Sequence, residues 1–152
     1  MKRIHIPPNG TVFLVPLPSN GFGLGVLIRA CGEGRAYGAF FRVRVASESE
    51  IDIKHLKLAD AIWRCKFGDY ALRRQLWPVI GSVPNWGASP WTLPDFARRH
   101  DDPRMCFLIK CDDKLDVIAT TLVELAQAKD LPDDAQFGSG VVEIKLDKLL
   151  ST

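Results

Sequence analysis

Residues 77–96 place the tightest limits on how this chain can fold. The segment holds three of the four tryptophans and four of the ten prolines, and its single charge is Asp95. No regular helix runs through prolines spaced in this way, because each lacks a backbone donor and clashes with the preceding turn. A loose loop is an equally poor fit, since indole rings are large and costly to leave in water. The composition predicts an extended, ordered segment lying across a hydrophobic surface. Such a segment either seals the core or contributes to a recognition surface.

The length and composition are those of one soluble globular domain, which we expect to span residues 1–152. A chain of this size buries roughly 68–70% of its unfolded surface, which is enough for a core without disulfides. Hydrophobic residues make up 47% of the chain and charged residues 25%, which are ordinary values. The net charge of +2 is too small to indicate attraction to nucleic acid or to a membrane.

Charge is distributed unevenly along the sequence. Residues 1–76 contain 12 Lys and Arg against 6 Asp and Glu, whereas residues 77–152 contain 8 against 12. The first half is therefore basic and the second half acidic. This pattern predicts two surfaces of opposite sign, unless folding interleaves the halves.

The sequence predicts a cytoplasmic protein with no cofactor. Two basic residues near Met1 are not followed by an apolar run of signal-peptide length, and no apolar run approaches the ~20 residues of a membrane span. The cysteines form no C-x-x-C pair, so we expect buried free thiols and neither disulfides nor zinc ligands. They are Cys31, Cys65, Cys106 and Cys111.

The first half of the chain is rich in strand patterns. β-branched and aromatic residues predict strands at 11–17, 22–29 and 36–45, with Asn20-Gly21 as a tight turn between the first two. Alternation predicts a fourth strand at 61–67. Ser47 and Glu50 resemble a helix start, which predicts a short helix ending near Leu56 or Leu58.

The rest of the chain mixes short helices and strands. We expect a turn of helix within 70–76, a core strand at 77–81, strands at 105–111 and 115–119, and a last strand at 141–146. A capping box at Thr121–Glu124 predicts a helix to about Lys129. The predicted architecture is α+β: a strongly coiled antiparallel β-sheet or partial barrel with two or three short helices.

The sequence offers little catalytic chemistry. The histidines, His5, His55 and His100, are scattered, and none has the spacing of a metal site. A glycine-rich stretch at 21–25 lies inside a predicted hairpin, where it does not match a dinucleotide site. An enzyme of unrecognised type would depend on His100 beside Asp101 and Asp102.

A second hypothesis is a small β-barrel that binds single-stranded nucleic acid. Basic and aromatic residues on a small barrel can hold such a strand. The alternation places only Phe40 on the same side as Arg42 and Arg44, with Phe41 on the other, so the support is thin. The residues for this reading are Arg29, Arg35, Arg42, Arg44, Arg64 and Lys66, with Tyr37, Phe40 and Phe41.

Several short motifs together resemble the immunity protein 26 family of bacterial polymorphic toxin systems. Members open with an F-x-x-P-L … G-x-G-x-V hairpin and carry a W-x-x-I-G segment in mid-chain. The matching residues are Thr11–Leu17, Phe22–Val26, Phe40-Phe41, Trp77–Gly81 and Leu93–Phe96. The resemblance implies a cytoplasmic protein that binds and blocks a cognate toxin, and it carries over no catalytic residue. Many inhibitors of nuclease toxins are strongly acidic, which this chain is not. Either the toxin is not a nuclease or the acidic second half supplies a local patch.

If the protein binds a toxin, the predicted contacts lie in and around residues 77–96, called the Trp/Pro segment below. Tryptophan and arginine are favoured at binding hot spots. Trp77 begins the predicted core strand at 77–81 and is therefore expected to be buried. The other two tryptophans of the segment are better candidates for contact with the toxin. The arginines on either side of the segment could form the rim of the interface. The predicted contact residues are Arg73, Arg74, Trp86, Trp91, Arg98 and Arg99.

Overall fold

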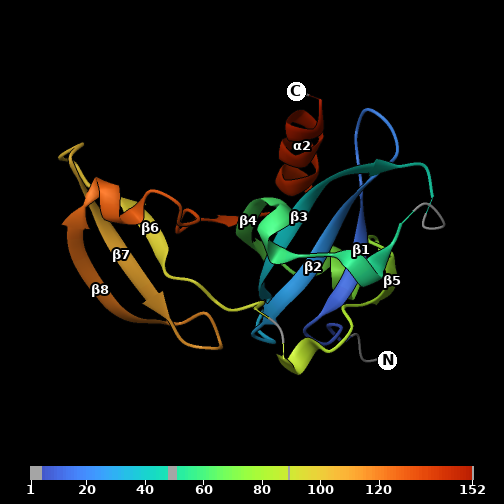
Figure 1. Ribbon diagram of the computed structural model, residues 1–152, viewed down its shortest axis with the longest axis horizontal. Coiled ribbons are helices and arrows are strands. Elements are labelled where there is room, and N and C mark those ends of the chain that lie inside the picture. The colour runs from blue at the N-terminus through green and yellow to red at the C-terminus, as the bar shows by residue number, and fades with distance from the viewer. Residues whose placement is uncertain (1–4, 48–50, 89, 152) are drawn as a thin grey trace.

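The computed structural model describes residues 5–47, 51–88 and 90–151. Most of its regular structure is β, in two open sheets that stand side by side (Figure 1). The larger sheet has the strand order β5-β1-β2-β3-β4-β9, and the smaller has the order β6-β7-β8. The strands of the larger sheet are β1 (Thr11–Pro16), β2 (Phe22–Ala30), β3 (Arg35–Val45), β4 (Ala61–Gly68), β5 (Val79–Ser82) and β9 (Gln136–Phe137). Those of the smaller sheet are β6 (Phe96–Arg99), β7 (Met105–Cys111) and β8 (Val117–Glu124).

Strands β1 to β4 form an antiparallel meander, which confirms the four strands predicted for the first half. The β1–β2 register places Pro16 opposite Phe22, and the Leu17 amide donates to the Gly21 carbonyl at 3.0 Å. Gly21 has φ of 71°, a value that glycine adopts without steric cost. The hairpin therefore forms where the sequence predicts it, but through a loop of residues 17–21 in which Gly21 has a positive φ and Asn20 does not, so the predicted tight Asn20-Gly21 turn is wrong in detail.

The larger sheet has a hydrophobic cluster on each face. Successive strand residues point to opposite faces, so Phe40 and Phe41 enter different clusters. One cluster contains Phe40 with Phe13, Phe67, Trp77 and the helix residue Leu146. The other joins Phe41 to Tyr37, Trp91, Phe96 and Ile109. Because Phe96 and Ile109 belong to the smaller sheet, this second cluster fastens the two sheets together.

Trp77 is the largest fully buried side chain among the described residues. Its ring stacks on Phe13 at 5.5 Å between centroids, and its Nε1–H donates to Glu143 at 2.9 Å. The predicted core role of Trp77 is therefore confirmed. The strand that follows, β5, begins at Val79 and lies at the sheet edge, where Val79 is about half exposed.

The predicted last strand at 141–146 is wrong, because these residues belong to helix α2 (Ser139–Leu150). The β-branched Val141, Val142 and Ile144 suggest a strand when they are considered alone. The buried residues are instead Val142 and Leu146, four apart, while Val141 and Ile144 face solvent. That spacing is the repeat of a helix face, and the buried face covers the cluster around Trp77.

The predicted helix at 121–129 is also wrong. Strand β8 continues through Thr121–Glu124. The capping box lies three residues later than predicted, between Glu124 and Gln127. It opens only the short 3-10 helix η5 (Leu125–Ala128). Tertiary pairing with β7 outweighs the local helix signal at Thr121.

The remaining helical segments are short. The start of the predicted helix at 47–56 falls partly on residues 48–50, outside the described residues. Beyond them lie two 3-10 turns, η2 (Ile53–His55) and η3 (Leu58–Asp60), in place of an α-helix. The expected helical turn within 70–76 is confirmed as α1 (Tyr70–Arg73), and η4 (Trp86–Ala88) lies in the Trp/Pro segment.

The α+β class holds in its coarse form, with mainly β structure and few helices. A partial barrel is not what forms, since both sheets of the described residues are open. Within the same residues, no helix combines the length and hydropathy required to cross a membrane.

Folding interleaves the basic and acidic halves of the chain. Within the described residues, four ion pairs join a cation from the first half of the chain (1–76) to a carboxylate from the second half (77–152). They are Arg29–Asp113 at 3.5 Å, Arg35–Asp116 at 2.8 Å, Arg44–Asp147 at 2.8 Å and Lys66–Asp134. The uneven charge along the sequence therefore serves contacts inside the molecule and does not simply divide the surface into two faces.

Candidate functional site

The smaller sheet stands to one side of the larger sheet in Figure 1 and includes the most exposed strand of the described structure, β8. Its strand β7 pairs with β6 on one side and β8 on the other. The free side of β6 is covered, because Ala97 exchanges backbone hydrogen bonds with Pro132 and Asp134 at 2.9 and 2.8 Å. Strand β8 has no neighbour on its outer side among the described residues. Seven of its eight residues are exposed, and the eighth, Val123, is partly so.

One face of this sheet carries a row of three large side chains. The register aligns Arg98 of β6 with Phe107 of β7, and Phe107 with Leu122 of β8. Directly opposed residues share a face, so the row crosses the whole sheet. Leu122 is 50% exposed and the Arg98 side chain 52% exposed, and His100 lies against Phe107 at 5.1 Å between ring centroids.

A groove of about 940 Å³ also lies on the smaller sheet. It runs between the sheet and η5, and its lining is mostly apolar with charged residues among them. The lining residues are Ala97, Arg99, His100, Asp101, Pro103, Met105, Cys106, Leu125, Ala126, Ala128, Lys129, Leu131 and Asp133. An apolar groove with a few charged groups is a common form of a site that binds another molecule.

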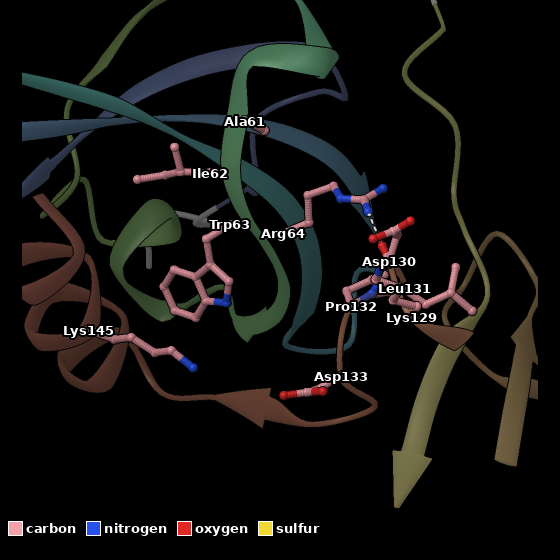
Figure 2. A pocket seen from close by; sticks show the side chains of 10 residues that line it. All are labelled: Ala61, Ile62, Trp63, Arg64, Lys129, Asp130, Leu131, Pro132, Asp133 and Lys145. Atoms are coloured by element: carbon pink, nitrogen blue, oxygen red, sulfur yellow. Dashed lines mark hydrogen bonds between the residues drawn. The ribbon is translucent and has the colours of Figure 1, made fainter. Parts of the chain in front are cut away.

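A smaller pocket of about 330 Å³ lies where β4 meets the segment 129–133 and α2 (Figure 2). Lys145 of α2 reaches over the Trp63 ring, 5.0 Å from its centroid. On the other side, Arg64 donates to the Asp130 carbonyl at 2.8 Å. Both cations are thus used in holding the walls together.

The predicted contact residues Trp86 and Trp91 lie next to each other, with ring centroids 5.8 Å apart. Trp91 is only 5% exposed and packs against Phe41 at 6.0 Å, so its indole is part of the core. Trp86 is half-buried and covers Gly10, where an added Cβ would lie 2.8 Å from the ring. Of the pair, Trp86 alone presents surface.

The predicted contacts Arg73 and Arg74 lie elsewhere. They directly follow Leu72, which is buried in the cluster on the α2 face, whereas Trp91 belongs to the cluster on the opposite face. Arg73 donates to Asp69 at 2.6 Å, and Arg74 lies over the Tyr70 ring at 5.4 Å. The structure therefore does not gather the six predicted residues on one flat surface.

Arg98 and Arg99 do lie on the exposed smaller sheet. The Arg98 guanidinium donates to Asp134 at 2.9 and 2.6 Å, and Lys66 pairs with the same carboxylate. Burial alone would raise the pKa of Asp134, but the hydrogen bonds from Lys66 and Arg98 outweigh it and lower the pKa. Asp134 therefore remains charged and joins the two sheets.

The His100–Asp102 pair of the enzyme hypothesis does not form in the described residues. His100 Nδ1 accepts from the Asp102 backbone amide at 2.9 Å, so it does not face that carboxylate. The Asp102 carboxylate is held by Arg104 at 2.9 Å, and this hydrogen bond lowers its pKa. The two groups do not act as an acid–base pair in this arrangement.

The basic residues of the nucleic-acid reading are committed to other parts of the chain. Arg42 and Arg44 both donate hydrogen bonds to α2. The other four make ion pairs or hydrogen bonds with residues in the range 113–134. Tyr37, Phe40 and Phe41 are all buried, so they offer no ring face for a base to stack on.

The sequence model of the family described as Immunity protein 26 matches residues 8–102, which is more than half of the chain. The chain belongs to this family. No curated protein and no solved structure matches it significantly. The resemblance found in the Thr11–Leu17 and Trp77–Gly81 motifs is thereby confirmed, and both motifs lie inside the matched region.

The Immunity protein 26 match extends from just before β1 through β6, and β7, β8 and α2 lie beyond it. The exposed strand β8 is thus outside the part that this chain shares with the family model. Sequence reasoning missed β8 as a surface element, because the capping-box pattern at Thr121 concealed its second half. The signal was present in the run Val117-Ile118 and Leu122-Val123, which is rich in β-branched residues.

Proposed function

We propose that this protein is a cytoplasmic immunity protein, one domain spanning residues 1–152, that binds a cognate bacterial toxin and neutralises it without catalysis. Membership of the immunity protein 26 family carries the proposal. The geometry supports it in two ways. The smaller sheet offers a row of large side chains on one face and a groove on the other for a protein partner, and the His100–Asp102 acid–base pair does not form.

The proposed toxin-binding surface is centred on the smaller sheet. It includes Arg98 of β6 and extends along the row to Leu122, while Arg99 lies on the other face of the sheet, where it lines the groove. Arginine, tryptophan and tyrosine are the residues enriched at the hot spots of protein interfaces. Trp86 is proposed as a further contact because part of its indole is exposed.

The remaining predicted contacts have different roles in this proposal. Trp91 supports Trp86 from beneath through their ring contact at 5.8 Å. Arg73 and Arg74 would contribute to binding only if the toxin also reached the α1 side of the larger sheet, opposite the Trp86 side.

Binding without catalysis makes a quantitative prediction for neutralisation. The cognate toxin, sought first in the gene immediately upstream of this one, is purified and its activity titrated with increasing amounts of the protein. A binding inhibitor protects in proportion to its amount, so inhibition is complete only near equivalence. Calorimetry on the same samples is expected to show direct binding.

Two results would contradict the proposal. One is full inactivation of the toxin at far less than equivalent amounts, because that requires turnover. The other is the absence of measurable binding to a toxin from which the protein nevertheless protects cells. Arg99→Ala is expected to weaken binding, with Arg74→Ala on the other side of the larger sheet as the matched control.

A further inference from the structure

Another pocket, of about 600 Å³, lies where the start of β4 meets the Trp/Pro segment. Its lining is mainly apolar, with two cations and, among the described residues, no carboxylate. All of these lining residues fall within 8–102, the part of the chain that matches the Immunity protein 26 model. They are Lys57, Leu58, Ala59, Ala61, Arg64 and Pro90. Such a lining fits a ligand that carries a negative charge beside apolar groups.

Arg64 is partly buried, and the described residues leave its charge unbalanced. Figure 2 shows its guanidinium directed away from Trp63, where it donates to the backbone carbonyl of Asp130 at 2.8 Å. No carboxylate in the described part of the chain lies within ion-pair distance of Arg64, whereas Lys66 of the same strand pairs with Asp134. A guanidinium has five N–H donors, and one carbonyl does not exhaust them. A further acceptor can therefore bind Arg64 while the contact to Asp130 is kept.

The hydroxyl of Tyr37 adds a second donor near Arg64. Tyr37 is fully buried, and its hydroxyl has no hydrogen-bond partner among the described residues. Burial raises the pKa of this hydroxyl to about 12, and the nearby Arg64 charge opposes that rise. A guanidinium has donors only, so Arg64 cannot accept the hydroxyl proton. The surroundings of Arg64 therefore hold more donors than acceptors, which favours an anion as the ligand.

Two further lining residues connect this pocket with the outside of the molecule. Lys57 is exposed, directly precedes η3, and makes no side-chain cap hydrogen bond there. Pro90 is also exposed and directly precedes Trp91, whose ring contacts Trp86 at 5.8 Å between centroids. Because Trp86 is a proposed toxin contact, a toxin that covers it is close enough to reach the pocket as well.

We propose that this pocket binds an acidic side chain of the toxin, an aspartate or glutamate with an apolar neighbour. This inference rests on the proposed function and specifies the chemistry that the toxin presents. Arg64 is the main anchor, because a guanidinium binds a carboxylate through two parallel hydrogen bonds. Lys57 adds a second positive charge, and Leu58 and Pro90 receive the apolar neighbour. A protein segment supplies the carboxylate and the apolar side chain together.

Charge reversal at two neighbouring lysines tests this assignment by calorimetry with the purified cognate toxin. Lys57→Glu is expected to weaken toxin binding roughly fivefold, because a like charge then faces the acidic side chain. Lys54→Glu is the matched control, since Lys54 is also exposed but does not line the pocket. It is expected to bind much as the wild type does. Arg64→Gln, which keeps an amide donor for the Asp130 carbonyl but loses the charge, is expected to weaken binding on the order of tenfold.

The outcomes separate the chemistry of the pocket from the function. If the wild type binds the toxin and Lys57→Glu binds it as well as Lys54→Glu does, the inference is overturned and the proposed function stands. No toxin binding by the wild type overturns both. Tight binding of free glutamate to the wild type without toxin assigns the pocket to a small carboxylate and also overturns the inference. Because both lysines are exposed, their comparison decides the matter even if Arg64→Gln fails to fold.

Discussion

At the scale of single residues, Gly25 shows how closely the aromatic cluster is packed. A Cβ at this position would lie 2.6 Å from two atoms of the Phe13 ring and 3.1 Å from the Phe40 ring. Both rings are fully buried and meet edge to face at 6.0 Å, so neither can move into solvent. The approach of Phe13 to Phe40 therefore depends on the absence of a side chain at position 25.

Gly25→Ala is expected to lower the free energy of unfolding by about 1–3 kcal/mol, as overpacking of a buried site does. Gly140→Ala is the matched control, since nothing lies within 4 Å of a Cβ there and the residue is in the first turns of α2. It is expected to raise stability by up to about 0.5–1 kcal/mol. Urea denaturation measures both, and equal effects of the two substitutions would contradict the packing argument.

The four cysteines are free, and they differ in accessibility. The prediction of buried thiols is confirmed for Cys65, Cys106 and Cys111, while Cys31 is partly exposed. Burial raises the pKa of the Cys65 and Cys111 thiols, which suppresses the reactive thiolate.

In the native protein, a thiol reagent such as DTNB is expected to modify Cys31 rapidly and the other three only on unfolding. The Cys31→Ser variant should lose the fast phase and retain the slow one. A fast phase that survives in this variant would show that the core opens more readily than the burial of its thiols indicates.

At the scale of elements, α2 is fastened to the larger sheet by both apolar and polar contacts. Leu146 enters the Trp77 cluster, while Asp147 accepts from Ser19 at 2.6 Å and from Arg44 at 2.8 Å. The Ser19 hydroxyl and the Arg44 guanidinium both lower the pKa of Asp147. The polar contacts tie the C-terminal turns of the helix to the β1–β2 hairpin and to β3.

Asp147→Ala is therefore expected to loosen the last turns of α2 while the sheet stays intact. Amide exchange should become faster in residues 146–150, with little change in β2. Lys148→Ala, at an exposed neighbouring position, is the control and should leave exchange unchanged. If exchange accelerates throughout the protein, Asp147 is needed for the whole fold and not for helix docking alone.

The elements that could be predicted from the sequence are those whose local pattern and tertiary setting agree. Strands β1 to β4 alternate or are β-rich, and loops such as residues 17–21 bound them. Local pattern and tertiary setting disagree at Thr121–Glu124, where a capping box is held in a strand by β7, and at Val141–Leu146, where β-branched residues form a helix. The surface at β8 could not be predicted because it depends on which strands are left unpaired.

At the scale of the whole molecule, Asp134 joins the two sheets. Its carboxylate pairs with Lys66 of β4 and Arg98 of β6 and is itself only 7% exposed. Hydrogen bonds from both cations hold its pKa below the usual value despite burial. The unfolded chain therefore binds a proton at this position at a higher pH than the folded chain does.

This linkage gives a pH dependence of known sign. The contribution of Asp134 to stability is complete above the unfolded pKa of about 3.9, and it is lost as the pH falls through the lower folded pKa. The Asp134→Asn variant is expected to be less stable than the wild type at neutral pH. The difference should narrow as the solution is acidified below about pH 4. Urea denaturation across this range measures it, and a difference that stays constant with pH would contradict the assignment.

The ion pairs that bridge the two halves of the chain have a consequence for synthesis on the ribosome. Arg29, Arg44 and Lys66 emerge well before their partners Asp113, Asp147 and Asp134. Until α2 has been translated, the face of the larger sheet that holds Phe13 and Trp77 also lacks its cover. Domains form from the N-terminus during translation, and exposed apolar surface makes such intermediates prone to aggregation. The nascent chain is therefore most vulnerable just before residues 139–150 leave the exit tunnel, and a ribosome that stalls there would display an apolar, basic sheet for chaperones to bind.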